Sequence, residues 1–82
     1  MLEIHYFGSY GERLGVGRER LAWRPELDSV ERVRQCLAAR GGVWVALDGT
    51  DLLCAHNQEV CGFEQGVDDG DELAFFSPIT GG

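Results

Sequence analysis

Hydrophobic and polar residues alternate along the start of the chain, and this alternation predicts a half-buried β-strand over residues 2–7. Leu2, Ile4 and Tyr6 lie on one face of such a strand, because successive side chains point to opposite faces. Glu3 lies on the opposite face. The apolar face is therefore expected to pack against the core.

The last apolar stretch of the chain has the same period of two and predicts a final strand. Leu73 and Phe75 fall on one face of this strand, whereas Ala74 and Phe76 fall on the other. Pairing with a neighbouring strand should fade at Pro78, because proline has no backbone N–H to donate. The chain beyond this proline is therefore expected to leave the domain.

Between these two ends, one segment has helical periodicity over enough residues to cover a sheet. Asp28 and Glu31 have the spacing of an N-cap residue and the reciprocal acid of a capping box. The helix is expected to run to about Arg40 and to stop at Gly41 and Gly42. Its expected buried stripe consists of Val30, Val33 and Leu37.

Shorter elements are predicted around this helix. Residues 18–24, 52–57 and 59–63 fit strands, and residues 9–14 fit a short helix. Residues 43–47 are apolar but too few for periodicity to decide between a strand and a helical turn.

The order of these elements favours an α+β protein with the ubiquitin-like β-grasp fold, in which a mixed sheet packs on one main helix. The first and last strands are the most apolar, so we expect them to lie side by side and parallel at the sheet centre. Residues 1–77 would form the domain, and residues 78–82 would form a flexible C-terminal tail.

The composition is that of one small folded domain, because the chain has 82 residues of which 44% are hydrophobic. The sequence contains neither a membrane-spanning apolar run nor a signal peptide, so we expect a cytoplasmic protein without a membrane partner. The net charge of −7 disfavours nucleic acid, because phosphates would repel the chain. The acidic excess serves either docking on a basic protein surface or solubility alone.

The sequence shows no constellation typical of a metal site or of a self-sufficient enzyme. Cys36, Cys54 and Cys61 are odd in number and lack a C-x-x-C spacing, which disfavours a disulfide framework or a zinc site. We expect them to be small core residues. The acidic run at residues 68–71 does not match a calcium loop, so a solvated turn is expected.

The terminal Gly81 and Gly82 are the strongest candidate for chemistry. Two residues without a Cβ fit a narrow channel, and the four residues after Pro78 can reach about 13–14 Å. A terminal carboxylate can be activated by ATP as an acyl-adenylate and then captured by sulfur or an amine. The alternative is a frayed chain end without a function.

The C-terminal segment closely resembles that of the small, sulfur-carrier subunit of molybdopterin synthase; it reads Asp69-Gly-Asp-Glu-Leu-Ala-Phe-Phe-Ser-Pro-Ile-Thr-Gly-Gly82. Residues 28–34 and 53–58 also resemble the helix and a strand of this family, so the resemblance covers essentially the whole chain. The ending Phe-Phe-x-Pro-x-Thr-Gly-Gly is its most specific part. Ser77 departs from the pattern, because the family often has a second proline there.

This resemblance implies that the chain binds no cofactor and is not an enzyme by itself. An E1-like adenylyltransferase would use ATP to adenylate Gly82, and sulfur from a sulfurtransferase would then displace AMP and leave a thiocarboxylate. In the large subunit of a heterotetrameric synthase, this sulfur would be transferred to precursor Z (cyclic pyranopterin monophosphate). The catalytic acid and base groups would belong to the large subunit.

The resemblance also suggests which residues meet the large subunit. Phe76 faces away from Leu73, so Phe76 and its neighbour Phe75 are candidates for an apolar interface, although both could instead be core residues. The residues expected to enter the large subunit's pocket are Pro78, Ile79, Thr80 and Gly81.

Three other functions stay open. A sulfur carrier of the thiamine pathway shares the fold and the Gly-Gly end, but it is usually shorter and lacks the Phe-Phe-x-Pro ending. A ubiquitin-like modifier would be conjugated to lysines of target proteins. A plain acidic interaction domain would have an inert tail.

Overall fold

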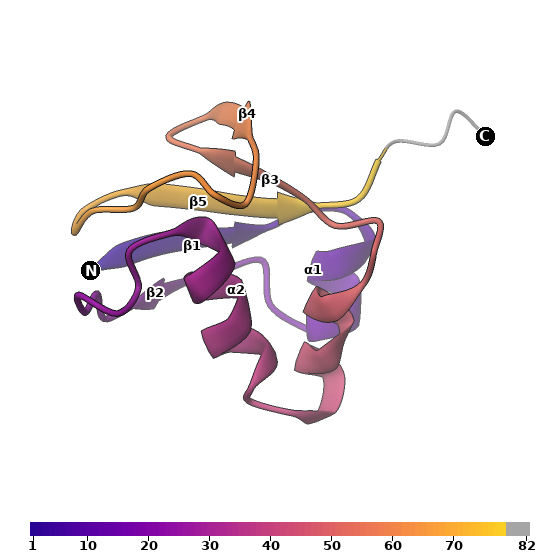
Figure 1. Cartoon of the computed structure of the whole chain (residues 1–82). Helices are drawn as coiled ribbons and strands as arrows, with labels where there is room; N and C mark the ends of the chain where they lie inside the picture. The colour runs from indigo at the N-terminus through magenta and orange to yellow at the C-terminus, as the bar shows by residue number, and fades with distance from the viewer. Residues whose placement is uncertain (79–82) are drawn as a thin grey trace.

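The computed structural model describes residues 1–78 and places their strands in one mixed sheet with the order β2-β1-β5-β3-β4 (Figure 1). One main helix packs on the sheet, as expected for an α+β fold. The strands are β1 (Leu2–Tyr6), β2 (Arg18–Leu21), β3 (Leu53–His56), β4 (Glu59–Cys61) and β5 (Glu72–Phe76). The helical elements are α1 (Ser9–Leu14), α2 (Val30–Ala38) and the 3₁₀-helix η1 (Gly42–Asp48).

Strand β5 occupies the centre of the sheet. It pairs in parallel with β1, which places Ile4 beside Leu73 and Tyr6 beside Phe75, and it pairs antiparallel with β3. The predicted parallel neighbours are therefore confirmed. Because β5 has a hydrogen-bonded strand on each side, its position in the domain is fixed along its whole length.

The core lies between one face of the sheet and the helical elements, which Figure 1 shows on the same side of the sheet. Alternation along β1 is confirmed, because its apolar residues are buried and its polar residues are half-buried. The ring of Tyr6 stacks on Phe75 with a centroid distance of 6.3 Å and meets Trp44 of η1 edge-on at 5.5 Å. Fully buried core residues include Leu2, Ile4, Tyr10, Val30, Val33, Leu37, Leu47, Leu73 and Phe75.

Several predicted boundaries were wrong: β4 ends at Cys61 rather than at residue 63, and the errors at α2 and β2 have identifiable reasons. The N-cap of α2 is Ser29 and not Asp28, because the Ser29 hydroxyl accepts the backbone N–H of Arg32 at 3.2 Å. Strand β2 ends at Leu21 rather than at residue 24, because Leu21 already pairs with Leu2, the first residue of β1.

The segment after α2 is helical, which settles the ambiguity of residues 43–47. Helix α2 itself ends at Ala38, shorter than expected, and the backbone N–H of Gly41 donates to the Ala38 carbonyl in a tighter turn. Gly41 and Gly42 have φ values of 78° and 57°, which glycine adopts readily, so the chain can turn into η1 there.

Strands β3 and β4 form a hairpin with a two-residue turn. Asn57 and Gln58 have φ values of 49° and 71°, as a type I′ turn requires. This turn sets the register in which His56 lies opposite Glu59 and Cys54 lies opposite Cys61. The predicted pair of strands is confirmed.

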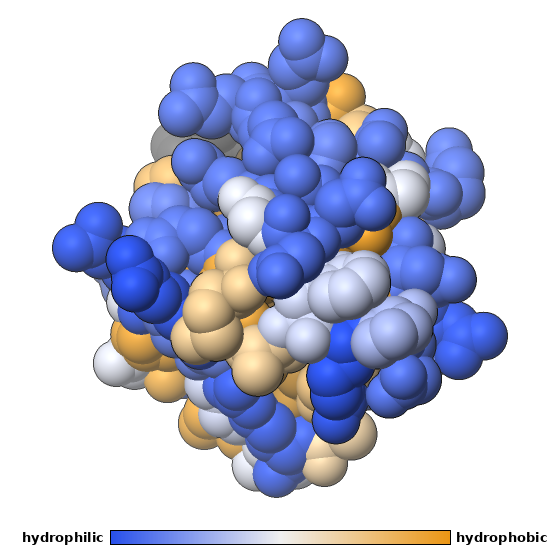
Figure 2. Space-filling view, turned by 90° about the vertical axis from the view of Figure 1, so that its left-hand side faces the viewer, coloured by the Kyte–Doolittle hydropathy of each residue, from blue (hydrophilic) through white to orange (hydrophobic). Residues whose placement is uncertain are grey.

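The end of the molecule opposite the C-terminal ends of β1 and β5 is mainly hydrophilic (Figure 2). The acidic turn before β5 carries Asp68, Asp69 and Asp71. Among residues 1–78, no helix is long and apolar enough to cross a bilayer.

We predict that Phe75→Ala lowers the free energy of unfolding by about 3–5 kcal/mol, because the fully buried ring leaves a cavity. Phe76→Ala is the matched control, since Phe76 is only half-buried and its truncation should cost clearly less. Urea denaturation followed by circular dichroism measures both. If both variants lost the same free energy of unfolding, Phe75 could not be a core residue and Phe76 a surface residue.

Candidate functional site

The C-terminal ends of β1 and β5 lie side by side, because the two strands are parallel neighbours (Figure 1). The backbone N–H of Phe7 donates to the carbonyl oxygen of Phe75 with an N···O distance of 3.0 Å, one step beyond β1. The last described residues, Ser77 and Pro78, therefore leave the sheet beside the turn that follows β1.

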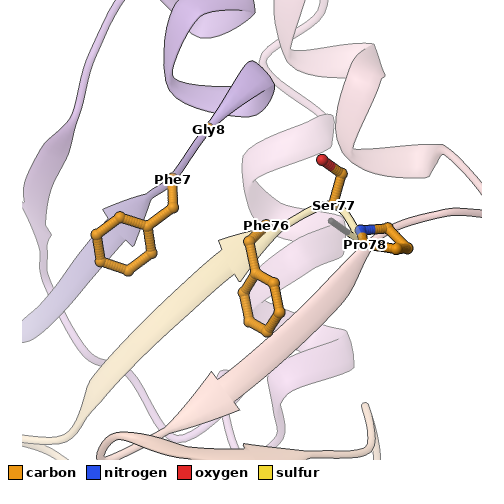
Figure 3. A pocket seen from close by; sticks show the side chains of 5 residues that line it. All are labelled: Phe7, Gly8, Phe76, Ser77 and Pro78. Carbon is orange, nitrogen blue, oxygen red and sulfur yellow. The ribbon is translucent and has the colours of Figure 1, made fainter. Parts of the chain in front are cut away.

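A groove of about 440 Å³ opens at this end of the sheet, lined by Phe7, Gly8, Phe76, Ser77 and Pro78. Figure 3 shows the rings of Phe7 and Phe76 standing next to one another on neighbouring strand ends. Phe7 is 53% exposed, which is unusual for a large aromatic side chain in a small domain. The groove is therefore an apolar surface at the point where the chain leaves the sheet.

Gly8, one of the residues that line this groove, has a backbone conformation that favours glycine. Its φ of 59° and ψ of −135° are accessible to glycine but costly for residues with a Cβ. This conformation lets the chain turn sharply from β1 into α1. After the turn, at the start of α1, the Ser9 hydroxyl lies 3.3 Å from the Ser77 hydroxyl. The chain after β1 therefore contacts the chain after β5 as well.

The register of the sheet extends this apolar surface across β3 and β4. Leu53 lies opposite Phe76, and Ala55 lies opposite both Ala74 and Val60. Paired residues project from the same face, and Val60 is 74% exposed. We call this surface the outer sheet face and define it by Phe7, Leu53, Ala55, Val60, Ala74 and Phe76.

Polar and charged side chains continue the outer sheet face from Phe7 back along β1 toward its start. The guanidinium of Arg20 lies 3.4 Å from the Glu3 carboxylate, and the ring of His5 lies 3.9 Å from the Glu72 carboxylate. The His5 ring also stacks on Phe7, with centroids 5.7 Å apart. The surface therefore changes from charged to apolar along the direction in which β5 runs.

Asp71 fixes the start of β5. Its carboxylate accepts the backbone N–H of Asp68 at 2.9 Å and lies 2.7 Å from the His56 ring nitrogen, and the Asn57 amide is 3.4 Å away. Burial alone would raise the pKa of Asp71, but these hydrogen bonds outweigh burial and hold the pKa below its ordinary value. The ionised carboxylate thus ties the turn before β5 to the β3–β4 hairpin.

The structure brings two of the predicted site residues, Phe76 and Pro78, into the groove. Phe75 is fully buried in the core, so we withdraw it from the expected interface: it shares its face with Leu73, which points to the helices. The predicted residues Ile79, Thr80, Gly81 and Gly82 lie outside the residues that the structure describes.

Sequence reasoning missed Phe7 and Gly8. The signal for Phe7 was present, because residue 7 continues the polar face of the first strand at a position where a large aromatic is out of place. The contact between Phe7 and Phe76 could not be predicted, because it depends on the register between β1 and β5, and the alternation within each strand does not give this register.

The three cysteines are free and lie where sequence reasoning placed them, Cys36 in α2, Cys54 in β3 and Cys61 in β4. Cys54 is buried, whereas Cys36 and Cys61 pack partly exposed against the core. Within residues 1–78, no three His, Cys, Asp or Glu side chains gather as a group that could hold a metal ion.

A small β-grasp domain whose central strand leads directly into a C-terminal Gly-Gly segment is the class of protein that this fold and site define. The chain belongs to the ThiS family, whose model matches residues 4–82. It is 37% identical to the molybdopterin synthase sulfur carrier subunit of Escherichia coli and 40% identical to that of Haemophilus influenzae, in each case over the full length of both chains. The resemblance to these sulfur-carrier subunits is thereby confirmed.

Solved structures show the same fold at lower identity. SAMP1 from Haloferax volcanii is 22% identical and superimposes with a TM-score of 0.77, covering 99% of this chain and 98% of that chain. Subunit 1 and 2 of the molybdopterin-converting factor from Helicobacter pylori were solved as a complex; its matching chain is 16% identical, with a TM-score of 0.66 and coverage of 99% and 97%. The predicted β-grasp fold is confirmed.

We predict that Gly8→Ala lowers the free energy of unfolding by roughly 1–3 kcal/mol, because alanine must adopt the strained backbone of the turn. Gly17→Ala is the matched control, since a Cβ meets open space at both positions but only Gly8 has a positive φ. Thermal unfolding of the two variants makes the comparison. A Gly8→Ala protein as stable as Gly17→Ala would show that the turn is not strained.

Proposed function

We propose that the chain carries sulfur as a thiocarboxylate on Gly82 and delivers it to precursor Z in the large subunit of molybdopterin synthase. The observation that carries this proposal is that the central strand β5 runs directly, beside an apolar groove, into a segment ending in Gly-Gly. The full-length relatives, themselves sulfur carrier subunits of molybdopterin synthase, support it.

The chemistry proceeds in two steps at the terminal carboxylate. In the first, a carboxylate oxygen of Gly82 attacks the α-phosphorus of ATP on an E1-like adenylyltransferase, and pyrophosphate leaves. In the second, sulfide-level sulfur (HS⁻), released from the persulfide of a sulfurtransferase by a reducing thiol, attacks the acyl carbon; the bond to AMP breaks, AMP leaves and the thiocarboxylate remains. Activation is needed because a carboxylate oxygen is a poor leaving group, whereas AMP is a good one.

The domain contributes a fixed point from which the terminus is delivered. Strand β5 pairs with β1 as far as Phe75 and with β3 as far as Phe76. The four residues beyond Pro78 can span at most about 13–14 Å. A partner that binds the outer sheet face therefore receives Gly82 within a limited distance of its own surface. We accordingly assign residues 1–77 to the domain and residues 78–82 to the delivered tail, of which Pro78, Ile79, Thr80 and Gly81 enter the partner's pocket.

We assign the outer sheet face as the docking surface for the large subunit. Phe7, Phe76 and Leu53 lie together beside the point where the tail begins, and exposed aromatic residues near the centre of an interface carry much of its binding energy. Apolar contact would hold the complex together, while the acidic net charge of −7 favours a basic partner surface. General acid and base groups for the transfer belong to the large subunit.

We predict that incubation with the adenylyltransferase, ATP and a sulfur donor raises the intact mass by about 16 Da, because one oxygen at Gly82 is replaced by sulfur. Intact-mass spectrometry measures this change. Gly82→Ala should fold normally and stay unloaded. An unchanged mass, under conditions that load a known carrier, would refute the sulfur-carrier proposal.

The same preparations separate the competing functions. Addition of the large subunit and precursor Z should consume the thiocarboxylate and produce molybdopterin. A loaded chain that does not react with them but supports thiazole formation would identify a carrier of the thiamine pathway. Isopeptide-linked products that disappear on deletion of Gly82 would identify a protein modifier.

We predict that Phe7→Ala weakens binding of the large subunit by about 10–100-fold, the range expected for a central aromatic contact. Val43→Ala is the control, because Val43 is 56% exposed, like Phe7, but lies on η1 on the opposite side of the sheet (Figure 1). Calorimetry or biolayer interferometry gives the two affinities. Equal affinities would rule out the outer sheet face as the docking surface.

A further inference from the structure

Cys54 and Cys61 lie directly opposite one another in the β3–β4 hairpin, on the helix side of the sheet. Their sulfur atoms are 3.7 Å apart, which is contact distance without a bond. Cys54 also pairs with the buried Phe75 in β5, which fixes the face to which both thiols point. The two cysteines therefore form a pair that the chain's other functions do not use.

The backbone spacing of this pair suits a disulfide. Directly opposed residues of antiparallel strands have Cα atoms about 4.5–5.5 Å apart, and disulfides form over Cα separations of about 4.4–6.8 Å. The sulfurs must still approach from 3.7 Å to about 2.0 Å, which rotation of the two side chains can supply.

The two thiols differ in access. Cys61 is half exposed on β4, the edge strand, whereas Cys54 is buried and donates its S–H to the Cys61 carbonyl oxygen at 3.3 Å. Burial, together with its contacts to Cys61, raises the pKa of Cys54 to about 12. An oxidant must therefore react first at Cys61, and Cys54 closes the bond afterwards.

We propose that Cys54 and Cys61 form a reversible redox site, which closes as an intramolecular disulfide in exchange with small-molecule disulfides. First, the Cys61 thiol loses a proton and its sulfur attacks the small disulfide, forming a mixed disulfide and releasing one small thiolate. Cys54 then loses its proton and attacks the Cys61 sulfur, which expels the second thiolate. In total, two protein thiols are oxidised and one small disulfide is reduced to two small thiols.

The bond would tie the edge strand β4 to β3, the neighbour of the central strand. The outer sheet face should keep its side chains in place, because Leu53, Ala55 and Val60 project from the other face of the same strands. Closing this short loop restricts the unfolded chain, so the oxidised domain should unfold at a higher temperature than the reduced one.

The test uses the full chain with its ordinary terminal carboxylate, equilibrated with reduced and oxidised glutathione in varied ratio. After an acid quench, free thiols are alkylated in denaturant, and intact mass and proteolytic peptides are recorded. We expect a species about 2 Da lighter before alkylation, in which Cys36 alone takes up the reagent. Its disulfide should map to Cys54 and Cys61.

Two variants make the result specific. Cys36→Ser should still lose two hydrogens, whereas Cys61→Ser, a change at a half-exposed edge position, should fold but not form the bond. The proposal is overturned if Cys54 and Cys61 remain fully alkylatable even in oxidised glutathione alone. It is likewise overturned if the oxidised species contains Cys36 or is a disulfide-linked dimer.

Discussion

The parallel pairing of β1 with β5 is the constraint on which the rest of the molecule depends. It joins the first and last strands of the chain at the sheet centre, so the C-terminal segment begins at the best-anchored strand. The same pairing brings the residues after β1 next to the residues after β5, and the groove between Phe7 and Phe76 is the result. The anchored strand and the apolar groove beside it therefore come from a single set of backbone hydrogen bonds.

Because side chains alternate along β5, one phenylalanine packs in the core and the next lies on the outer sheet face. Phe75 and Leu73 enter the core, where Phe75 stacks on Tyr6, whereas Phe76 projects beside Phe7 on the outer sheet face. Two adjacent phenylalanines thus have different roles because a strand turns them to opposite sides. A shift of one residue in the register would exchange them, and the domain would lose its core and the surface that we assign to docking together.

The sequence predicted most elements because alternation and helical spacing are local signals. It also predicted the parallel central pair, because the first and last strands are the most apolar of the chain and the centre of the sheet is its best-buried part. What it could not supply was register: the meeting of Phe7 with Phe76 and of Cys54 with Cys61 depends on hydrogen bonds between segments far apart or across a turn. The N-cap of α2 was misjudged for a different reason: Asp28 and Ser29 are both good N-cap residues, so the sequence does not decide between them.

The sheet separates two kinds of sulfur chemistry in one small chain. On its outer face lies the surface that we assign to the large subunit, which would receive sulfur from Gly82; on its helix face lie Cys54 and Cys61, with their sulfurs in contact. The pair points into the domain, and Cys54 is buried. Cys61, on the edge strand, is the one member of the pair that a small disulfide can reach. The redox site that we propose would therefore act on the hairpin from the face opposite to the one that we assign to docking.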